Sequence, residues 1–169
     1  TGWGLRTLAR GQARFNPMSY HNGSVWPHDT ALGAAGMAHY GERDAVTLLM
    51  GEIYSAASHF NMRLPELFCG FERQPGEAPV AYPVACLPQA WAAGSVFLMM
   101  QAVLGLRIDA FEQRVTIVNP ALPTGMERLT VTGLQVGQAR TDLLFRRLGD
   151  QVAVTPRNKV GNLRIETLR

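Results

Sequence analysis

The hydrophobic periodicity of this chain changes near residue 106. Before that point, apolar residues recur at three- and four-residue steps, which indicates amphipathic helices. After it, the spacing shifts towards two, β-branched residues become frequent and turn residues follow at short intervals, which indicates strands. We therefore predict a mainly α chain with a β-rich tail, divided into residues 1–106 and 107–169.

Three helices are predicted in the first part. The first covers about residues 26–40, where Pro27 suits the first turn and Gly41 suits the carboxy-terminal cap. The second covers about residues 42–61. The third, about 88–105, carries no charge and is apolar almost all round. Its uninterrupted apolar stretch is shorter than the roughly 20 residues that a bilayer needs, so we expect a helix buried between others and no membrane partner.

The tail is predicted to form a small antiparallel β-sheet. Its strand candidates are residues 114–118, 129–132, 140–145, 152–155 and 163–166. Hairpin turns are expected at Gly137 and at Gly149–Asp150, because glycine adopts the backbone angles that tight turns require.

The predicted helices are apolar on broad faces, and they cannot easily bury all of this surface against one another. The chain also starts at Thr1 with neither an initiator methionine nor a signal-peptide pattern. We therefore expect it to be the carboxy-terminal piece of a longer protein, with the upstream part of the same polypeptide as its partner.

Composition argues against several classes of function. Apolar residues make up 47% of the chain and charged residues 17%, which is typical of a packed domain and not of a disordered tail. The net charge of +3 is spread out, with Arg146–Arg147 the only adjacent basic pair, so a nucleic-acid partner is not expected. Cys69 and Cys86 make neither a disulfide framework nor a CxxC site. We expect two buried thiols in a reducing cytoplasm.

A loop before the first helix, residues 16–29, mixes aromatic, polar and glycine residues. Sugars bind to aromatic rings that stack on their apolar faces and to polar groups that hold their hydroxyls. The groups of these kinds in the loop are Tyr20, His21, Asn22, Trp26, His28 and Asp29. A helix start with a packed tryptophan and an ordinary capping network explains the composition equally well. The spacing of the histidines fits no zinc pattern, so no metal is expected.

Two further segments could carry chemistry. Glu66 is the lone carboxylate of residues 63–71, among leucines and phenylalanines whose burial would raise its pKa, as proton transfer requires. The alternative is a surface glutamate beside a buried Leu–Phe pair. Gln89 and Trp91 open the third helix and can face a pocket there, whereas a tryptophan on such a helix more commonly belongs to the core.

Three segments together resemble a known family. Residues 20–27 (Tyr-His-Asn-Gly-Ser-Val-Trp-Pro) are similar to the Tyr-His-x-Gly-Thr/Ser-Val-Trp-Pro block of the bacterial amylo-α-1,6-glucosidase and glycogen-debranching family. Residues 65–70 (Pro-Glu-Leu-Phe-Cys-Gly) resemble its Ser-Glu-x-Phe/Leu-x-Gly segment. Residues 83–91 resemble its Pro-x-(Gly/Ala)-Cys-x-(Ala/Pro)-Gln-Ala-Trp block. Order and approximate spacing agree, and the resemblance covers about residues 1–106.

The resemblance implies a fold and an activity. The helices would be the closing members of an (α/α)6 toroid, with the three segments on one rim. The activity would be inverting hydrolysis of an oligosaccharide or α-linked glucan without a cofactor. One carboxylic acid protonates the leaving oxygen and one carboxylate activates water in such a reaction.

The resemblance also implies roles for single residues. Glu66 falls where the family has its general base, and the sugar subsite would be shaped by Tyr20, His21, Asn22, Trp26 and Gln89. The family's general acid lies upstream, so we expect the chain alone to be inactive, with Asp29 the one stand-in within it. His28–Asp29 departs from the family pattern, which leaves the exact substrate open. The competing interpretations are a non-catalytic carbohydrate-binding or accessory module and a purely structural helical domain.

Overall fold

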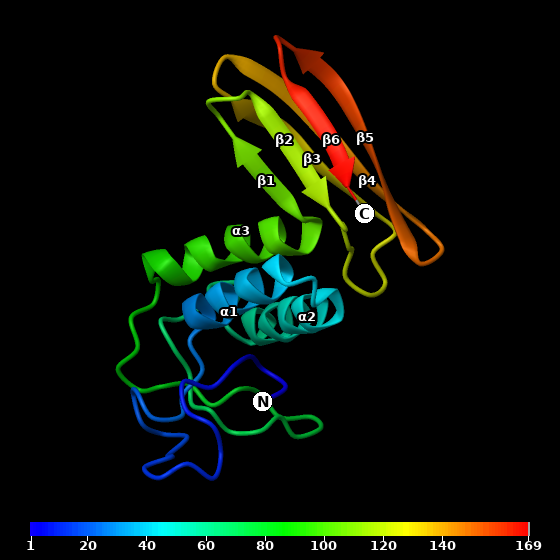
Figure 1. The fold of residues 1–169 in the computed structure, drawn as a ribbon. Coiled ribbons are helices and arrows are strands. Elements are labelled where there is room, and N and C mark those ends of the chain that lie inside the picture. The colour runs from blue at the N-terminus through cyan, green and yellow to red at the C-terminus, as the bar shows by residue number, and fades with distance from the viewer. Residues whose placement is uncertain (169) are drawn as a thin grey trace. The chain divides into compact units, whose positions relative to one another are not determined.

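The computed structural model describes residues 1–168 and divides into two compact units, Thr1–Met100 and Gln101–Arg169 (Figure 1). Helices precede a β-rich tail, as predicted.

The first unit contains helices α1 (Pro27–His39) and α2 (Arg43–His59), which lie side by side (Figure 1). Pro27 occupies the first turn of α1, where its missing N–H removes no helical hydrogen bond. Gly41 follows the last turn with a φ of 85°, a left-handed conformation that glycine adopts without strain. Both predicted ends of this helix are confirmed to within two residues.

Helix α3 (Ala90–Leu104) begins in the first unit and buries a stripe of small and flexible side chains, including Ala92, Ser95 and Met99. Phe97, by contrast, is 78% exposed. Within residues 1–168, the expected burial of this helix therefore holds for one face only. Composition shows that a helix is apolar, whereas the neighbouring elements decide how much of it is covered. None of the helices within residues 1–168 combines the length and apolar character that a membrane span requires.

The rest of the first unit consists of loops that short bridges connect. Val25 and Phe68 exchange two backbone hydrogen bonds of 3.0 Å, and Phe68 also bridges to Ala81. Trp3 and Ala56 complete the buried cluster around this pair. Ala56 belongs to α2, so the loops that carry the candidate residues are anchored on a helix through a shared core.

Within its described residues, 101–168, the second unit contains two three-stranded sheets. The strands are β1 (Leu106–Asp109), β2 (Arg114–Val118), β3 (Arg128–Val136), β4 (Ala139–Leu148), β5 (Gln151–Val160) and β6 (Arg164–Leu168). One sheet has the order β1-β2-β6, with β2 and β6 parallel, and the other is the antiparallel meander β3-β4-β5. The prediction of one antiparallel sheet is wrong, because an alternating pattern identifies a strand and not the strand it pairs with.

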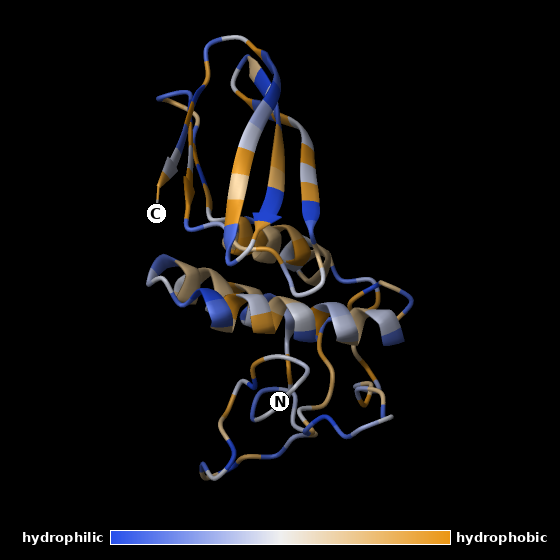
Figure 2. Ribbon diagram, turned by 90° about the vertical axis from the view of Figure 1, so that its right-hand side faces the viewer, coloured by the Kyte–Doolittle hydropathy of each residue, from blue (hydrophilic) through white to orange (hydrophobic). Residues whose placement is uncertain are grey.

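The local features of the tail agree with expectation. All five predicted strands exist, and the hairpins β3–β4 and β4–β5 turn at Gly137 and Gly149, with φ of 59° and 61°. Bands of hydrophobic and hydrophilic residues alternate along the strands (Figure 2). Ile117 of β2 and Phe145 of β4 are fully buried, and they place the core of this unit on its two central strands.

Candidate active site

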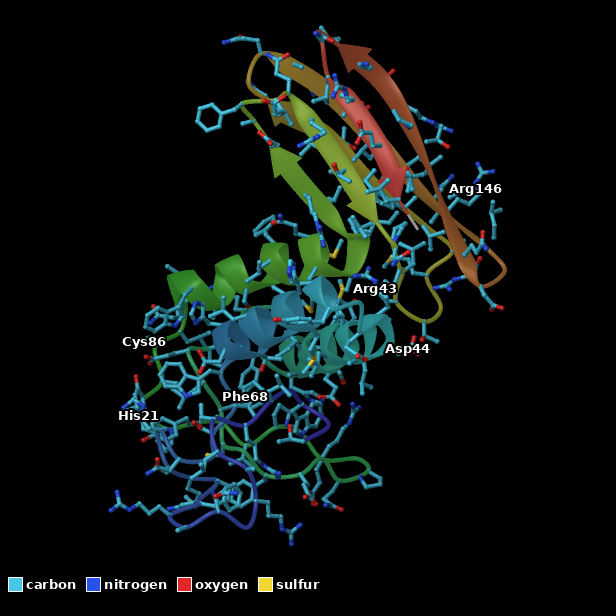
Figure 3. The ribbon with its side chains drawn as sticks, viewed as in Figure 1. His21, Arg43, Asp44, Phe68, Cys86 and Arg146 are labelled. Carbon is cyan, nitrogen blue, oxygen red and sulfur yellow. The ribbon has the colours of Figure 1, made fainter. Side chains whose placement is uncertain are left out.

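The first unit brings together the three segments that the sequence indicated. The bridge between Val25 and Phe68 joins the first loop to the second. The second loop is joined to the third segment by the backbone N–H of Glu66, which donates to the carbonyl of Cys86 at 3.0 Å. Figure 3 labels one residue from each segment, His21, Phe68 and Cys86, on the loop side of this unit.

Glu66 lies where the three segments meet. Its residue is only 7% exposed, so the alternative of a surface glutamate is wrong. The Tyr20 hydroxyl donates to Oε1 at 2.6 Å, and the backbone N–H of Cys86 donates to Oε2 at 3.2 Å. Each carboxylate oxygen therefore has a donor, one from the first segment and one from the third.

These two donors stabilise the charged form of Glu66. The hydrogen bond from Tyr20, followed by the backbone hydrogen bond from Cys86, lowers the pKa of Glu66 below its ordinary value and outweighs desolvation, which would raise it. Our expectation of a raised pKa is therefore wrong. The apolar neighbours are visible in the sequence, but the donors come from distant segments. The same hydrogen bond to Glu66 is the main cause that raises the pKa of Tyr20 to about 12. The pair is a neutral phenol and an ionised carboxylate at neutral pH.

Three aromatic rings contact the ring of Tyr20. The rings of His21, Trp26 and Tyr82 meet it edge-on, with centroids 4.7, 4.9 and 5.6 Å away. Trp26 is 8% exposed, and its indole N–H donates to the Tyr20 carbonyl at 3.1 Å and to Ser24 Oγ at 3.0 Å. Trp26 thus contributes to the site by holding the main chain of Tyr20.

A second aromatic pair is more open. The His28 ring stacks on Trp91 with centroids 5.6 Å apart and planes 27° apart. Trp91 is 46% exposed, so it is not the core tryptophan that its helix position suggested. The centroid of Trp91 also lies 6.2 Å from that of Trp26, which connects the two aromatic groups. Asp29 is exposed and its carboxylate lies 3.3 Å from His28 Nδ1.

The remaining predicted residues lie at the edge of the arrangement. The exposed His21 ring is nearly parallel to that of Trp26, at 6.3 Å. Asn22 is exposed, and its backbone N–H donates to Ser19 Oγ at 3.2 Å. Gln89 Oε1 accepts from the backbone N–H of Ala90 at 3.2 Å, which places its side chain at the first turn of α3.

Sequence reasoning did not single out Tyr82 or Cys86 as site residues. Cys86 is part of the third segment, residues 83–91, and Tyr82 directly precedes it, so the block that carries the resemblance was the available signal. Cys86 is exposed, so the expectation of two buried thiols is wrong for it. Its loop meets Glu66 through the backbone N–H and leaves Cys86 itself at the surface. Cys69 is buried, and burial raises the pKa of its thiol. Within residues 1–168, no three His, Cys, Asp or Glu side chains gather as a metal site would require.

A carboxylate with a donor at each oxygen, connected through Tyr20 and Trp26 to the more open rings of Trp91 and His28, is a combination that sugar hydrolysis can use. Residues 1–68 match the family model of the mannosylglycerate hydrolase MGH1-like glycoside hydrolase domain. A glycoside hydrolase-like domain is therefore present in this part of the chain. The match includes the first loop and Glu66, and it ends before the segment that carries Cys86 and Trp91. No curated protein matches the chain.

Proposed function

We propose that this chain supplies the general base of an inverting glycoside hydrolase, and that the base is Glu66. The observation that carries the proposal is the geometry of this carboxylate, which is 7% exposed, lies where the three segments meet and accepts a hydrogen bond at each oxygen. An inverting hydrolase needs such a carboxylate to take a proton from water while that water attacks the anomeric carbon.

The reaction also needs an acid that protonates the leaving oxygen. We assign it to the upstream part of the same polypeptide, because Asp29 is exposed and is paired with His28 on α1. In this proposal the chain by itself does not turn over substrate. The cytoplasm remains our proposed location, and the free thiols of Cys69 and Cys86 are compatible with it.

The proposed catalytic domain is an (α/α)6 toroid in which α1, α2 and α3 are the closing helices. Exposed apolar side chains support this arrangement, notably Leu48 and Tyr54 of α2, which are 62% and 65% exposed, and Phe97 of α3. Helical neighbours would remove this apolar surface from water.

The proposed substrate is an oligosaccharide or α-linked glucan of the debranching type. The stacked rings of His28 and Trp91 offer the partly exposed aromatic surface that a sugar ring needs. A second candidate is a glycoside of the mannosylglycerate type, which the description of the matching family supports. A non-catalytic carbohydrate-binding module is the competing function, and it assigns no chemical role to Glu66.

The test compares the full-length protein with its Glu66→Gln variant on a panel of α-linked glucans and on mannosylglycerate. We expect kcat to fall by about 10²–10⁴-fold, since a positioned base contributes that much. The exposed Glu77 provides the matched control, and Glu77→Gln should retain activity. NMR should show that the first product has the anomeric configuration opposite to that of the cleaved bond.

Two results would contradict the proposal. Equal activity of wild type and Glu66→Gln would make the carboxylate structural and favour the carbohydrate-binding module. Sugar release by residues 1–169 alone would show that the general acid does not come from upstream.

A further inference from the structure

We propose that Tyr20 is a positioning residue, whose hydroxyl fixes the Glu66 carboxylate for proton abstraction, and not a residue that binds sugar with its ring. This inference rests on the proposed function of Glu66 as the general base. It changes the role that the resemblance implied for Tyr20, and the contacts of the residue carry the change.

The first step is the contact between the two side chains. The Tyr20 hydroxyl lies 2.6 Å from Glu66 Oε1, the short distance expected of an O–H donor on a charged oxygen. The Cys86 N–H holds Oε2 at the same time. A carboxylate that is held at both oxygens cannot rotate freely about its terminal bond. Each oxygen still has a lone pair, so the group can accept a proton from water.

The second step is that Tyr20 is itself held. Its carbonyl oxygen accepts hydrogen bonds from Trp26 Nε1 at 3.1 Å and from Ser24 Oγ at 2.8 Å. Its ring meets the rings of Trp26, His21 and Tyr82. The half-buried Tyr20 thus has its hydroxyl engaged by Glu66 and its ring in contact with three other rings, whereas Trp91, at 46% exposed, offers sugar a more open ring.

The third step is electrostatic. Burial alone would raise the pKa of Glu66, and the hydrogen bond from Tyr20 is the largest cause that lowers it. Tyr20 is a neutral donor at neutral pH, because the same contact raises its pKa to about 12. Tyr20 therefore stabilises the charged form of the base without taking the proton itself.

The test uses Tyr20→Phe in the full-length protein, since this change removes the hydroxyl and keeps the ring. The first readout needs no activity. It is a ¹³C-carboxyl NMR titration of glutamate-labelled protein, in which the Glu66 signal is the one missing from Glu66→Gln. We expect the pKa of Glu66 to move upward, since a donor that stabilises the charged form is lost.

The second readout is the pH profile of kcat/KM. Its acidic limb reports the base of the free enzyme and should move upward by the same amount in Tyr20→Phe. Tyr40→Phe is the matched control, because Tyr40 is 84% exposed at the end of α1, and both readouts should stay at wild-type values. Circular dichroism spectra of the variants show whether each one is folded.

The outcomes separate this inference from the proposed function. A Glu66 titration in Tyr20→Phe that superimposes on wild type overturns the positioning role, whatever the activity. An upward NMR shift with a matching shift of the acidic limb supports it. An upward NMR shift in a protein whose activity does not depend on Glu66 supports the contact but removes its catalytic purpose, and so overturns the inference as stated.

Discussion

Gly70 shows how one residue allows two loops to approach. Its N–H donates to the carbonyl of Pro17 at 2.8 Å, and a side chain built at Gly70 would overlap the backbone oxygen of Gly23. Backbone atoms cannot move aside as the end of a flexible side chain can. The absence of a side chain at this position therefore permits the first and second segments to meet beside Glu66.

We predict that Gly70→Ala destabilises the protein by about 2–3 kcal/mol, as overpacking of a well-packed site does. The measurement is urea denaturation followed by circular dichroism. Gly51→Ala is the matched control, because a side chain at Gly51 meets nothing within 4 Å in the exposed middle of α2. That control should gain about 0.5–1 kcal/mol from helix propensity. Equal urea midpoints for Gly70→Ala and wild type would show that the loops are not closely packed here.

At the scale of elements, the meander β3-β4-β5 contains a carboxylate that links all three strands. Asp142 of β4 accepts the N–H of Gly133 on β3 at 2.7 Å and the side-chain amide of Asn158 on β5 at 2.7 Å. The pairing register shifts beside it, between Val131 and Leu134 on β3. The carboxylate thus occupies a place where the regular ladder of hydrogen bonds is interrupted.

This arrangement predicts a pH-dependent stability. The hydrogen bond from Gly133, followed by that from Asn158, lowers the pKa of Asp142. A group whose pKa is lowered by folding stabilises the protein above its unfolded pKa, which is about 3.9 for aspartate, and that stability is lost as pH falls through the folded pKa. Asp142→Asn should therefore lower the melting temperature at pH 7, and the difference from wild type should shrink as the pH approaches 3.

Thermal melts at several pH values check this prediction. Asp150→Asn, in the exposed turn between β4 and β5, is the control and should change the melting temperature little at pH 7. A difference between Asp142→Asn and wild type that stays constant from pH 7 to pH 3 would be inconsistent with a charge-dependent contact.

At the scale of the whole molecule, the chain divides into two compact units, and each has a core of its own. The first unit is centred on Trp3, Val25, Ala56 and Phe68. The second is centred on the central strands of its two sheets, where Phe145 is fully buried. Shortening a buried side chain in either core should therefore destabilise the elements that surround that core.

We predict that Phe145→Ala costs about 3–5 kcal/mol, as the removal of a buried phenylalanine does. Hydrogen exchange should show the loss of protection in β3, β4 and β5. The control is Phe111→Ala, since Phe111 is fully exposed and its removal should change stability by no more than about 0.5 kcal/mol. Unchanged protection in these strands would argue against a core centred on Phe145.

Much of the fold was predictable because its causes are local. Three helices, five strands and two hairpin turns follow from periodicity, Pro27, Gly41 and turn glycines. Strand β1 was missed because its four residues, Leu106–Asp109, follow the apolar α3 almost directly and are too few to show a period of two. The exposed face of α3 was also unpredictable, since exposure depends on neighbouring elements.

The candidate site, like the fold, could be predicted only in part from the sequence. By itself, the sequence determined which segments carry aromatic and polar groups and that Glu66 lies among apolar neighbours, because residue type and sequence distance suffice for both. The tertiary structure alone decided the direction in which the pKa of Glu66 is shifted. Its donors, Tyr20 and Cys86, lie 46 and 20 positions away, and hydrogen bonds from such distant residues form only when the loops meet. Those two hydrogen bonds outweigh desolvation, and so they reverse the pKa shift that the local sequence predicts.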